Sequence, residues 1–393
     1  MALLPIPNLE SQVISQQLTD LIQQKIKENK GWIDFATFMH MALYTPGLGY
    51  YSGGTTKFGM DGDFVTAPEI SSLFAKILAP QAAQILACEQ GNILELGAGT
   101  GKLASDLLLE LVQLNHLPKQ YFILEVSAYL RQIQRETLQK KLSVDLFERV
   151  VWLDALPKSF KGLVLGNEVL DAIPVHLIHQ TPKGLFECGV SFDGDFVWRD
   201  QPKNQAATLS ASSLTESLPN NLPYNYLTEV CPAASALVSS LAEMLEVGVI
   251  LFIDYGFGAA EYYHPQRNEG TLMCHYQHYA HSNPLINIGL QDITAHVNFT
   301  QIAHAALFNS DTGPHEIRLA GYVNQAQFLI NCGILDILQR YSPSDSHYIK
   351  FAAAAQKLLS PAEMGELFKV IAFSKGVDDV LIGFKSGDKS HTL

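Results

Sequence analysis

The sequence predicts an α/β fold, a doubly wound, Rossmann-like sheet of parallel strands. Strand-like and helix-like segments alternate from residue 92 to residue 256, and a glycine-rich turn follows the first strand. Two apolar segments, 368–376 and 379–387, are expected to pair as an antiparallel C-terminal hairpin that finishes the sheet. Because each crossover must return to the same edge of the sheet, alternation of this kind indicates parallel strands.

The alternating region defines the individual elements. Apolar runs predict strands at 92–99, 120–127, 149–156 and 248–256, and a strand running into a turn at 161–175. Amphipathic repeats predict helices at 102–114, 130–142 and 234–245. In such a sheet the ligand crevice lies at the carboxyl ends of the strands, so the residues just after each strand are the candidates for function.

Residues 1–80 are expected to form a separate N-terminal region. Its apolar periodicity predicts a helix over 9–29, which Asn8 can cap, and a second helix over 33–43. A glycine- and aromatic-rich loop follows, and another helix begins at about Pro68. Loops of this length in a compact protein are usually functional or disordered, and the aromatic content argues for order.

The core domain is expected to span 81–393, with two insertions. Short strands and polar turns mark the first insertion at about 176–228. The second, at about 259–365, is rich in His and Tyr, with helices near 325–340 and 349–358. These insertions could serve partner docking or self-association into a homodimer.

Composition limits the class of protein. The 393 residues carry a formal net charge of -13 and no run of Lys or Arg, so a nucleic-acid binder is not expected. A basic partner or a cationic substrate suits this charge better. The five cysteines are scattered, which disfavours a disulfide framework. The N-terminus lacks a signal-peptide pattern and no apolar run is long enough for insertion into a membrane, so we expect a bacterial cytoplasmic location.

The most informative segment is the turn after the first strand. Gly97, Gly99 and Gly101 alternate with other residues, and Glu95 precedes them. Positions without side chains let a ligand approach the backbone, and the N-terminus of the next helix offers N–H groups to an anion. A nicotinamide or flavin fingerprint would place a third glycine at 102, which is Lys102. The observed spacing therefore favours S-adenosylmethionine, whose carboxylate would meet these N–H groups.

Two further carboxylates follow later strands. Glu125 ends the second strand, where it can accept hydrogen bonds from both ribose hydroxyls of a nucleoside ligand. Asp154 ends the third strand, where it can accept from an adenine amino group. The alternative for Asp154 is a helix cap before Leu156.

The reaction side is expected at the end of the fourth strand. Asn167, Glu168 and Asp171 bring an amide and two carboxylates there. The spacing of the two acids places them on one side of a helical turn. Acids beside a sulfonium suggest a cationic acceptor such as an arginine guanidinium, which carboxylates bind bidentately. The alternative is that both acids only cap the turn.

No metal site is expected. His275, His278 and His281 are regularly spaced, but histidines in such a segment are more often hydrogen-bonded structure than ligands. The GxSxG motif of a Ser-His-Asp hydrolase does not occur.

The assembled motifs resemble the MidA-like family over almost the whole chain. The resemblance rests on GYYS (49–52), GDFVTAPEIS (62–71), LELGAGTGKLASDLL (94–108), LEVS (124–127), NEVLDAIPVH (167–176), IDYG (253–256) and DITAHVNF (292–299). The loop before Glu69 and the turn at Glu168 are the most specific of these motifs.

The resemblance implies a class I methyltransferase that uses S-adenosylmethionine as cofactor. It further implies symmetric dimethylation of an arginine on a subunit of the NADH–quinone oxidoreductase, respiratory complex I, in the context of its assembly. It makes the N-terminal loop a lid over the cofactor, with Thr66, Pro68 and Glu69 as cofactor neighbours. The alternatives are a methyltransferase for a small molecule or another protein side chain, a non-catalytic assembly factor that binds S-adenosylmethionine, and a dehydrogenase.

Overall fold

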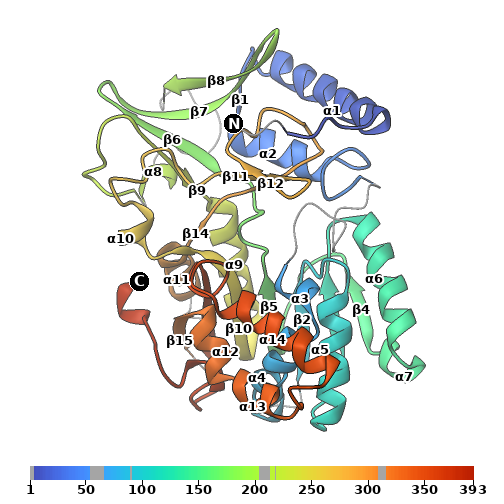
Figure 1. Ribbon diagram of the computed structural model, residues 1–393. Helices are drawn as coiled ribbons and strands as arrows, with labels where there is room; N and C mark the ends of the chain where they lie inside the picture. Colours follow the sequence, from blue (N-terminus) through green and yellow to red (C-terminus); the bar gives the residue numbers. More distant parts are fainter. Residues whose placement is uncertain (1–3, 54–65, 89–90, 203–212, 217, 309–315) are drawn as a thin grey trace. The chain divides into compact units, whose positions relative to one another are not determined.

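The computed structural model describes most of the chain (Figure 1). The described residues are 4–53, 66–88, 91–202, 213–216, 218–308 and 316–393. They group into two compact units, each built from separate stretches of sequence. The first unit comprises 1–64, 171–235 and 259–296, and the second comprises 65–170, 236–258 and 297–393. Among the helices described, none is both long and apolar enough to cross a membrane.

The second unit contains the predicted doubly wound sheet. Its main strands are β2 (Asn92–Leu96), β3 (Tyr121–Leu124), β4 (Val150–Leu153), β5 (Phe160–Asn167), β10 (Leu245–Phe257), β15 (Ile317–Asn324) and β16 (Phe368–Lys375). Their order is β15-β16-β10-β5-β2-β3-β4, and the short β14 (Val297–Asn298) pairs with β10. The five strands from β4 to β10 are parallel, as predicted, and β16 runs antiparallel between β10 and β15.

Helices cover both faces of this sheet. They are α3 (Ala67–Ile70), α4 (Leu73–Cys88), α5 (Lys102–Gln113), α6 (Ala128–Lys141), α7 (Val144–Phe147), α9 (Pro232–Met244), α11 (Phe299–Leu307), α12 (Gln325–Asn331), α13 (Ile334–Gln339) and α14 (Ser346–Leu359). One apolar cluster joins α4, α5 and α12 to α14 with alternate residues of the strands, such as Leu165 and Val323. Phe299 of α11 packs on Tyr322, the chain neighbour of Val323, so α11 covers the opposite face.

The expected C-terminal hairpin is wrong in its second strand. Residues 368–375 do form the antiparallel strand β16. On the side away from β10, however, this strand pairs with β15 and not with 379–387. The later segment contains the short 3-10 helix η2 (Ile382–Phe384). Gly383 lies against the Phe328 ring, and its N–H donates to Gln81 Oε1 at 2.8 Å. These contacts with α12 and α4 hold the segment against the helices, and it does not pair with β16 as a strand.

The first unit has its own strands and core. Its elements are α1 (Leu9–Glu28), β1 (Ile33–Asp34), α2 (Phe35–Tyr44), β6 (His176–Thr181), β7 (Gly184–Asp193), β8 (Asp195–Pro202), α8 (Ser213–Glu216), β9 (Tyr226–Val230), α10 (Ala259–Tyr262), β11 (Met273–Tyr276), β12 (Tyr279–His281) and β13 (Asp292–Thr294). One sheet runs β1-β7-β6-β9 with β8 beside β7, and a second runs β12-β11-β13. Residues from α1, α2, β6, β7 and 272–295 share one apolar cluster.

The N-terminal helices follow the predicted pattern only in part. Asn8 caps α1 by accepting from Ser11 N at 2.8 Å, and Leu18, Ile22 and Ile26 are buried as expected. Leu9 is 81% exposed, because the first turns of α1 extend beyond the apolar cluster. The second helix begins at Phe35, after Asp34 has capped it through Thr37 N at 2.8 Å.

The compact units divide the chain differently from the predicted domains. Residues 66–80 belong with the second unit, because α4 packs on α5 and β5. The second insertion ends near 296, since 297–365 supply β14, β15 and helices that pack on the sheet. Residues 171–235 fall in the first unit, where β6, β7, β8 and β9 join β1 in one antiparallel sheet.

Candidate functional site

The glycine turn of the second unit has the geometry of a ligand cradle. Gly97, Gly99 and Gly101 all have positive φ, at 58°, 53° and 81°, a conformation that is costly for residues with side chains. A Cβ on Gly99 would have no atom of the described residues within 4 Å, so this part of the structure leaves open space above Gly99. Gly101 is the N-cap residue of α5, so the turn leads directly into the helix N-terminus, where the first N–H groups have no partner within the helix.

Glu95 lies beneath this turn as a buried carboxylate. Its side chain is in β2, and its Oε2 accepts from the Tyr121 hydroxyl at 2.7 Å. Burial raises the pKa of Glu95 to about 7, the Tyr121 bond lowers it in part, and the charge of Glu125 raises it further. Glu95 is therefore a group whose charge is sensitive near neutral pH.

Glu125 follows β3 directly and is held at both oxygens. Oε1 accepts from Ser127 N at 2.9 Å, and Oε2 accepts from Gln134 Nε2 at 3.0 Å. Burial raises the pKa of its carboxyl, and these two hydrogen bonds and the nearby Arg131 lower it in part. The carboxylate is thus fixed at the carboxyl end of β3, where the sequence predicts a ribose contact.

Asp154 follows β4 and forms an ion pair. Its Oδ1 lies 2.6 Å from Arg131 Nη1, and its side chain is 92% exposed. No helix begins here, so the alternative of a cap before Leu156 is wrong. Arg131 also donates to the carbonyls of Glu125 and Leu153, at 2.7 and 2.6 Å, and so joins the ends of β3 and β4.

The three predicted lid residues belong to α3. Thr66 is the N-cap residue of this short helix, Pro68 is buried in it, and Glu69 accepts a short hydrogen bond from the Thr100 hydroxyl of the glycine turn. The sequence therefore brings Glu69 next to the cofactor turn. The rest of the predicted lid, 54–65, lies outside the described residues.

The reaction-side turn follows β5 and is not helical. Glu168 has a φ of 53°, which is unusual for a residue with a side chain and contradicts the predicted helical turn. Its Oε1 lies 3.2 Å from Asn167 Nδ2 and 3.4 Å from Ala67 N. Asn167 Oδ1 is buried and accepts no hydrogen bond from the part of the chain that the structure describes.

Asp254 holds this turn in place. It lies in β10, is buried, and its Oδ2 accepts from Val169 N at 3.1 Å and Leu170 N at 2.9 Å. Burial raises the pKa of its carboxyl to about 7, and the charge of Glu168 adds to the shift. The sequence predicts the strand that contains Asp254 but gives no sign of this supporting contact.

Asp171 belongs to the first unit and is described there. It is buried, and its carbonyl accepts from Ala295 N at 3.0 Å. The Tyr51 hydroxyl donates to Asp292 at 2.7 Å. Burial, followed by the charges of Asp292, Tyr44 and Asp171, raises the pKa of Tyr51 well above its usual range. Asp171 therefore lies in an acidic, tyrosine-rich part of this unit.

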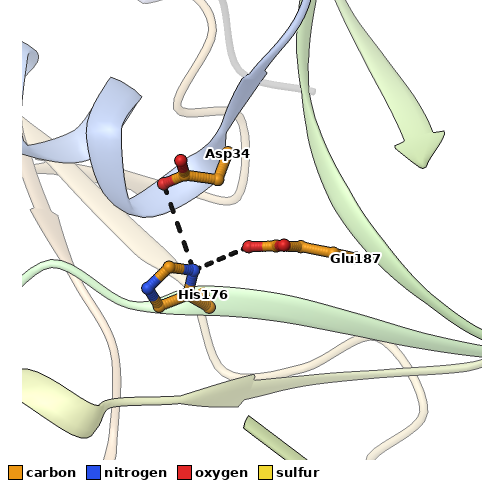
Figure 2. A group of neighbouring side chains, drawn as sticks. All are labelled: Asp34, His176 and Glu187. Carbon is orange, nitrogen blue, oxygen red and sulfur yellow. Dashed lines mark hydrogen bonds and ion pairs between the residues drawn. The ribbon is translucent and has the colours of Figure 1, made fainter. Parts of the chain in front are cut away.

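One cluster of the first unit could be taken for a metal site. Asp34, His176 and Glu187 bring ligand atoms within 4.8 Å of one another (Figure 2). His176 Nδ1 lies only 2.7 Å from Glu187 Oε1 and 4.0 Å from Asp34 Oδ1. Both Asp34 oxygens also accept from Thr37, at 2.8 and 3.0 Å. We interpret the cluster as a charge-assisted hydrogen bond that joins β6, β7 and the start of α2.

The regularly spaced histidines lie in a hairpin. His275 is in β11, His281 is in β12, and His278 lies in the turn between them with a φ of 67°. Burial lowers the pKa of His275, and the neighbouring His281 lowers it further. This placement fits the structural interpretation better than a ligand set.

Comparison with known proteins agrees with this geometry. Residues 73–315 match the model of a family described as S-adenosyl-L-methionine-dependent methyltransferases. The mitochondrial protein arginine methyltransferase NDUFAF7 of Danio rerio is 30% identical, with 86% of this chain and 82% of that protein aligned. Its Mus musculus counterpart is 28% identical, over 91% and 85% of the two chains.

A solved structure is more similar still. A superfamily member from Burkholderia thailandensis, crystallised with S-adenosyl-homocysteine, is 47% identical and aligns over 100% of both chains with a TM-score of 0.92. The fold is therefore that of a class I methyltransferase, and the cofactor expected from the glycine turn is confirmed.

Proposed function

The chain belongs to the S-adenosyl-L-methionine-dependent methyltransferase family, and from this we propose that its methyl acceptor is an arginine guanidinium of a protein. The names of the mitochondrial relatives, which are protein arginine methyltransferases, support this acceptor. The formal net charge of -13 also suits a cationic partner.

One observation carries the proposal: the reaction-side turn presents hydrogen-bond acceptors. Asn167 Oδ1 is buried without a donor among the described residues, and the Glu168 carboxylate lies beside it. A guanidinium has five N–H donors and no acceptor, so it is complementary to such a turn. A hydroxyl or thiol acceptor has at most one donor and is less complementary to such a turn.

The chemistry then assigns roles to the residues of the turn. S-adenosylmethionine supplies a methyl group on a sulfonium sulfur; the guanidinium nitrogen attacks this carbon, the sulfur keeps the bonding electrons, and S-adenosylhomocysteine leaves. Glu168 would orient the guanidinium and draw its positive charge away from the attacking nitrogen. Such positioning is worth about 7–11 kcal/mol of the barrier in well-oriented reactions. A carboxylate then takes the proton that the nitrogen loses.

The finer parts of the proposal come from the family resemblance. They are symmetric dimethylation, a subunit of the NADH–quinone oxidoreductase as substrate, and a part in complex I assembly. A cytoplasmic location is a separate part of the proposal. Self-association into a homodimer is a further part. Cell fractionation tests the location, and sedimentation of the purified chain tests the homodimer.

The test is methyl transfer from labelled S-adenosylmethionine to purified subunits of the oxidoreductase, with analysis of the methylated amino acid. We expect labelled dimethylarginine with the wild type. Glu168→Gln should lower the rate by about 10²-fold or more while it still binds S-adenosylhomocysteine. Glu136→Gln, on the exposed side of α6, is the matched control and should keep its activity.

The other outcomes point to the alternatives. Label on a small molecule or on another side chain would replace arginine as the acceptor. Binding of S-adenosylhomocysteine without any transfer, together with normal complex assembly in Glu168→Gln cells, would identify a non-catalytic assembly factor.

A further inference from the structure

Gln134 is a completely buried amide on the inner side of α6. Its Nε2 donates to Gly99 O at 3.1 Å and to Glu125 Oε2 at 3.0 Å. Its Oε1 accepts from Trp152 Nε1 at 2.9 Å. One side chain thus connects the glycine turn, the acid after β3, and strand β4.

The neighbours fix the orientation of this amide. A carbonyl and a carboxylate need donors, whereas the Trp152 indole N–H needs an acceptor. Only one of the two amide orientations satisfies all three, so Gln134 cannot rotate without losing every bond. The Arg135 guanidinium, 4.3 Å from the centre of the Trp152 ring, limits movement of the indole as well.

These bonds hold the two protein segments that are predicted to contact opposite ends of the cofactor. Glu125 has its second oxygen bound by Ser127 N, so Gln134 completes the fixation of the carboxylate. At the glycine turn, a Cβ on Gly101 would lie 3.2 Å from the Gln134 Cα, so the turn packs directly on this residue. The distance between the turn and the carboxylate is therefore set by Gln134 before any ligand arrives.

We propose that Gln134 is a positioning residue for the adenosyl ligand: it holds the Glu125 carboxylate and the Gly99 backbone at a fixed distance from each other. The proposal rests on the placement of the cofactor at this turn. Gln134 is buried beneath Glu125 and Gly99. Removing its amide should therefore weaken ligand binding indirectly, through these two residues.

The first experiment measures S-adenosylhomocysteine binding by calorimetry to Gln134→Leu, which removes all three bonds at similar volume. We expect affinity to fall roughly tenfold or more. Gln132→Leu is the matched control, because Gln132 lies on the exposed side of the same helix and bonds only Glu136, at 2.7 Å, among the described residues. Its affinity should stay within about threefold of the wild type.

A second variant separates positioning from a general structural role. Gln134→Glu has the same shape but places a second carboxylate against Glu125, and repulsion between the two charges raises the pKa of one of them. The affinity of this variant relative to the wild type should recover as pH falls from 8.5 to 6, because the shared proton restores a donor to Glu125. Glu95 and Arg131, which act on Glu125 from β2 and α6, are present in both proteins, so the ratio isolates residue 134.

Either arm can overturn the proposal. Wild-type affinity in folded Gln134→Leu would remove the positioning role. If that variant does not fold, a pH-independent affinity ratio for Gln134→Glu would do the same, because a purely structural residue would alter melting temperature without altering that ratio. Absence of binding to the wild type would overturn the cofactor site itself, and this inference with it.

Discussion

Two carboxyl groups of the site are buried in the sheet, away from water. Asp254 and Glu95 are both buried at the carboxyl ends of strands, and burial raises the pKa of each to about 7. Each carboxyl is stabilised by hydrogen bonds and destabilised by a neighbouring acid. Their ionisation is therefore linked to the stability of the folded protein.

Asp254→Asn should change how stability depends on pH. The ordinary pKa of an aspartate is 3.8, so between about pH 4 and 7 the folded protein keeps a proton that the unfolded chain releases. Stability from this group therefore falls as pH rises through that window. The melting temperature of the variant minus that of the wild type should rise from pH 5 to pH 8. A constant difference would contradict a raised pKa for Asp254. Glu168→Gln should move the upper end of the pH window to lower pH, because it removes the neighbouring charge.

Gly99→Ala should weaken cofactor binding more than it affects folding. A Cβ there meets no atom of the described residues, so the folding cost that the structure shows is that of the left-handed backbone, about 1–2 kcal/mol. The methyl group projects into the space where the ligand is expected. Calorimetry with S-adenosylhomocysteine should show at least a tenfold loss, whereas unchanged affinity would move the ligand away from Gly99.

The residues found only in the structure share one property. The position of the glycine turn and of the acids after each strand can be predicted, because the alternation of strands and helices places them in the sequence. Gln134 and Asp254 act through backbone groups of distant segments, Gly99 and Leu170, and no local pattern shows those contacts. Gln134 also lies in a polar helix, where a glutamine normally faces water.

Among the elements, the parallel strands depend on close backbone contact where they begin. Gly162 of β5 and Gly248 of β10 lie side by side, and a Cβ on Gly248 would lie 1.9 Å from Gly162 O. This contact is possible only without side chains. It sets the register that brings Asp254 next to the turn of Glu168.

Gly248→Ala should therefore destabilise the protein strongly, by about 3 kcal/mol or more, because the backbone must move apart. Gly184→Ala is the matched control: it also has a positive φ, 118°, but a Cβ there meets no atom of the described residues. Its cost should stay near 1 kcal/mol. Urea unfolding of both variants is the measurement, and equal losses would show that contact at Gly248 is unimportant.

The alternation of strands and helices was predictable, whereas the partner of β16 was not. Segment 379–387 is apolar and follows a turn, which locally favours a hairpin. Its observed contacts are with Gln81 and Phe328, far away in the chain. The true partner, β15, lies within a stretch that composition assigned to an insertion.

For the whole molecule, each unit has its own apolar cluster. S-adenosylhomocysteine should stabilise the unit that contains the glycine turn, since a ligand at 100 times its Kd adds about 2.7 kcal/mol to the state that binds it. Hydrogen exchange should slow at β2, β3 and the start of α5 more than in β6 and β7. Greater protection in β6 and β7 would contradict a cofactor site in the second unit.

The interleaving of the two units along the chain has a consequence for synthesis. Strand β10 emerges from the ribosome after β5, but the strand that covers its other edge, β16, begins only at Phe368. Until then β10 presents an apolar edge with unpaired backbone groups, which is the kind of surface that aggregates or recruits chaperones. Nascent chains released before Phe368 should therefore be insoluble, although every residue of the glycine turn has already been made.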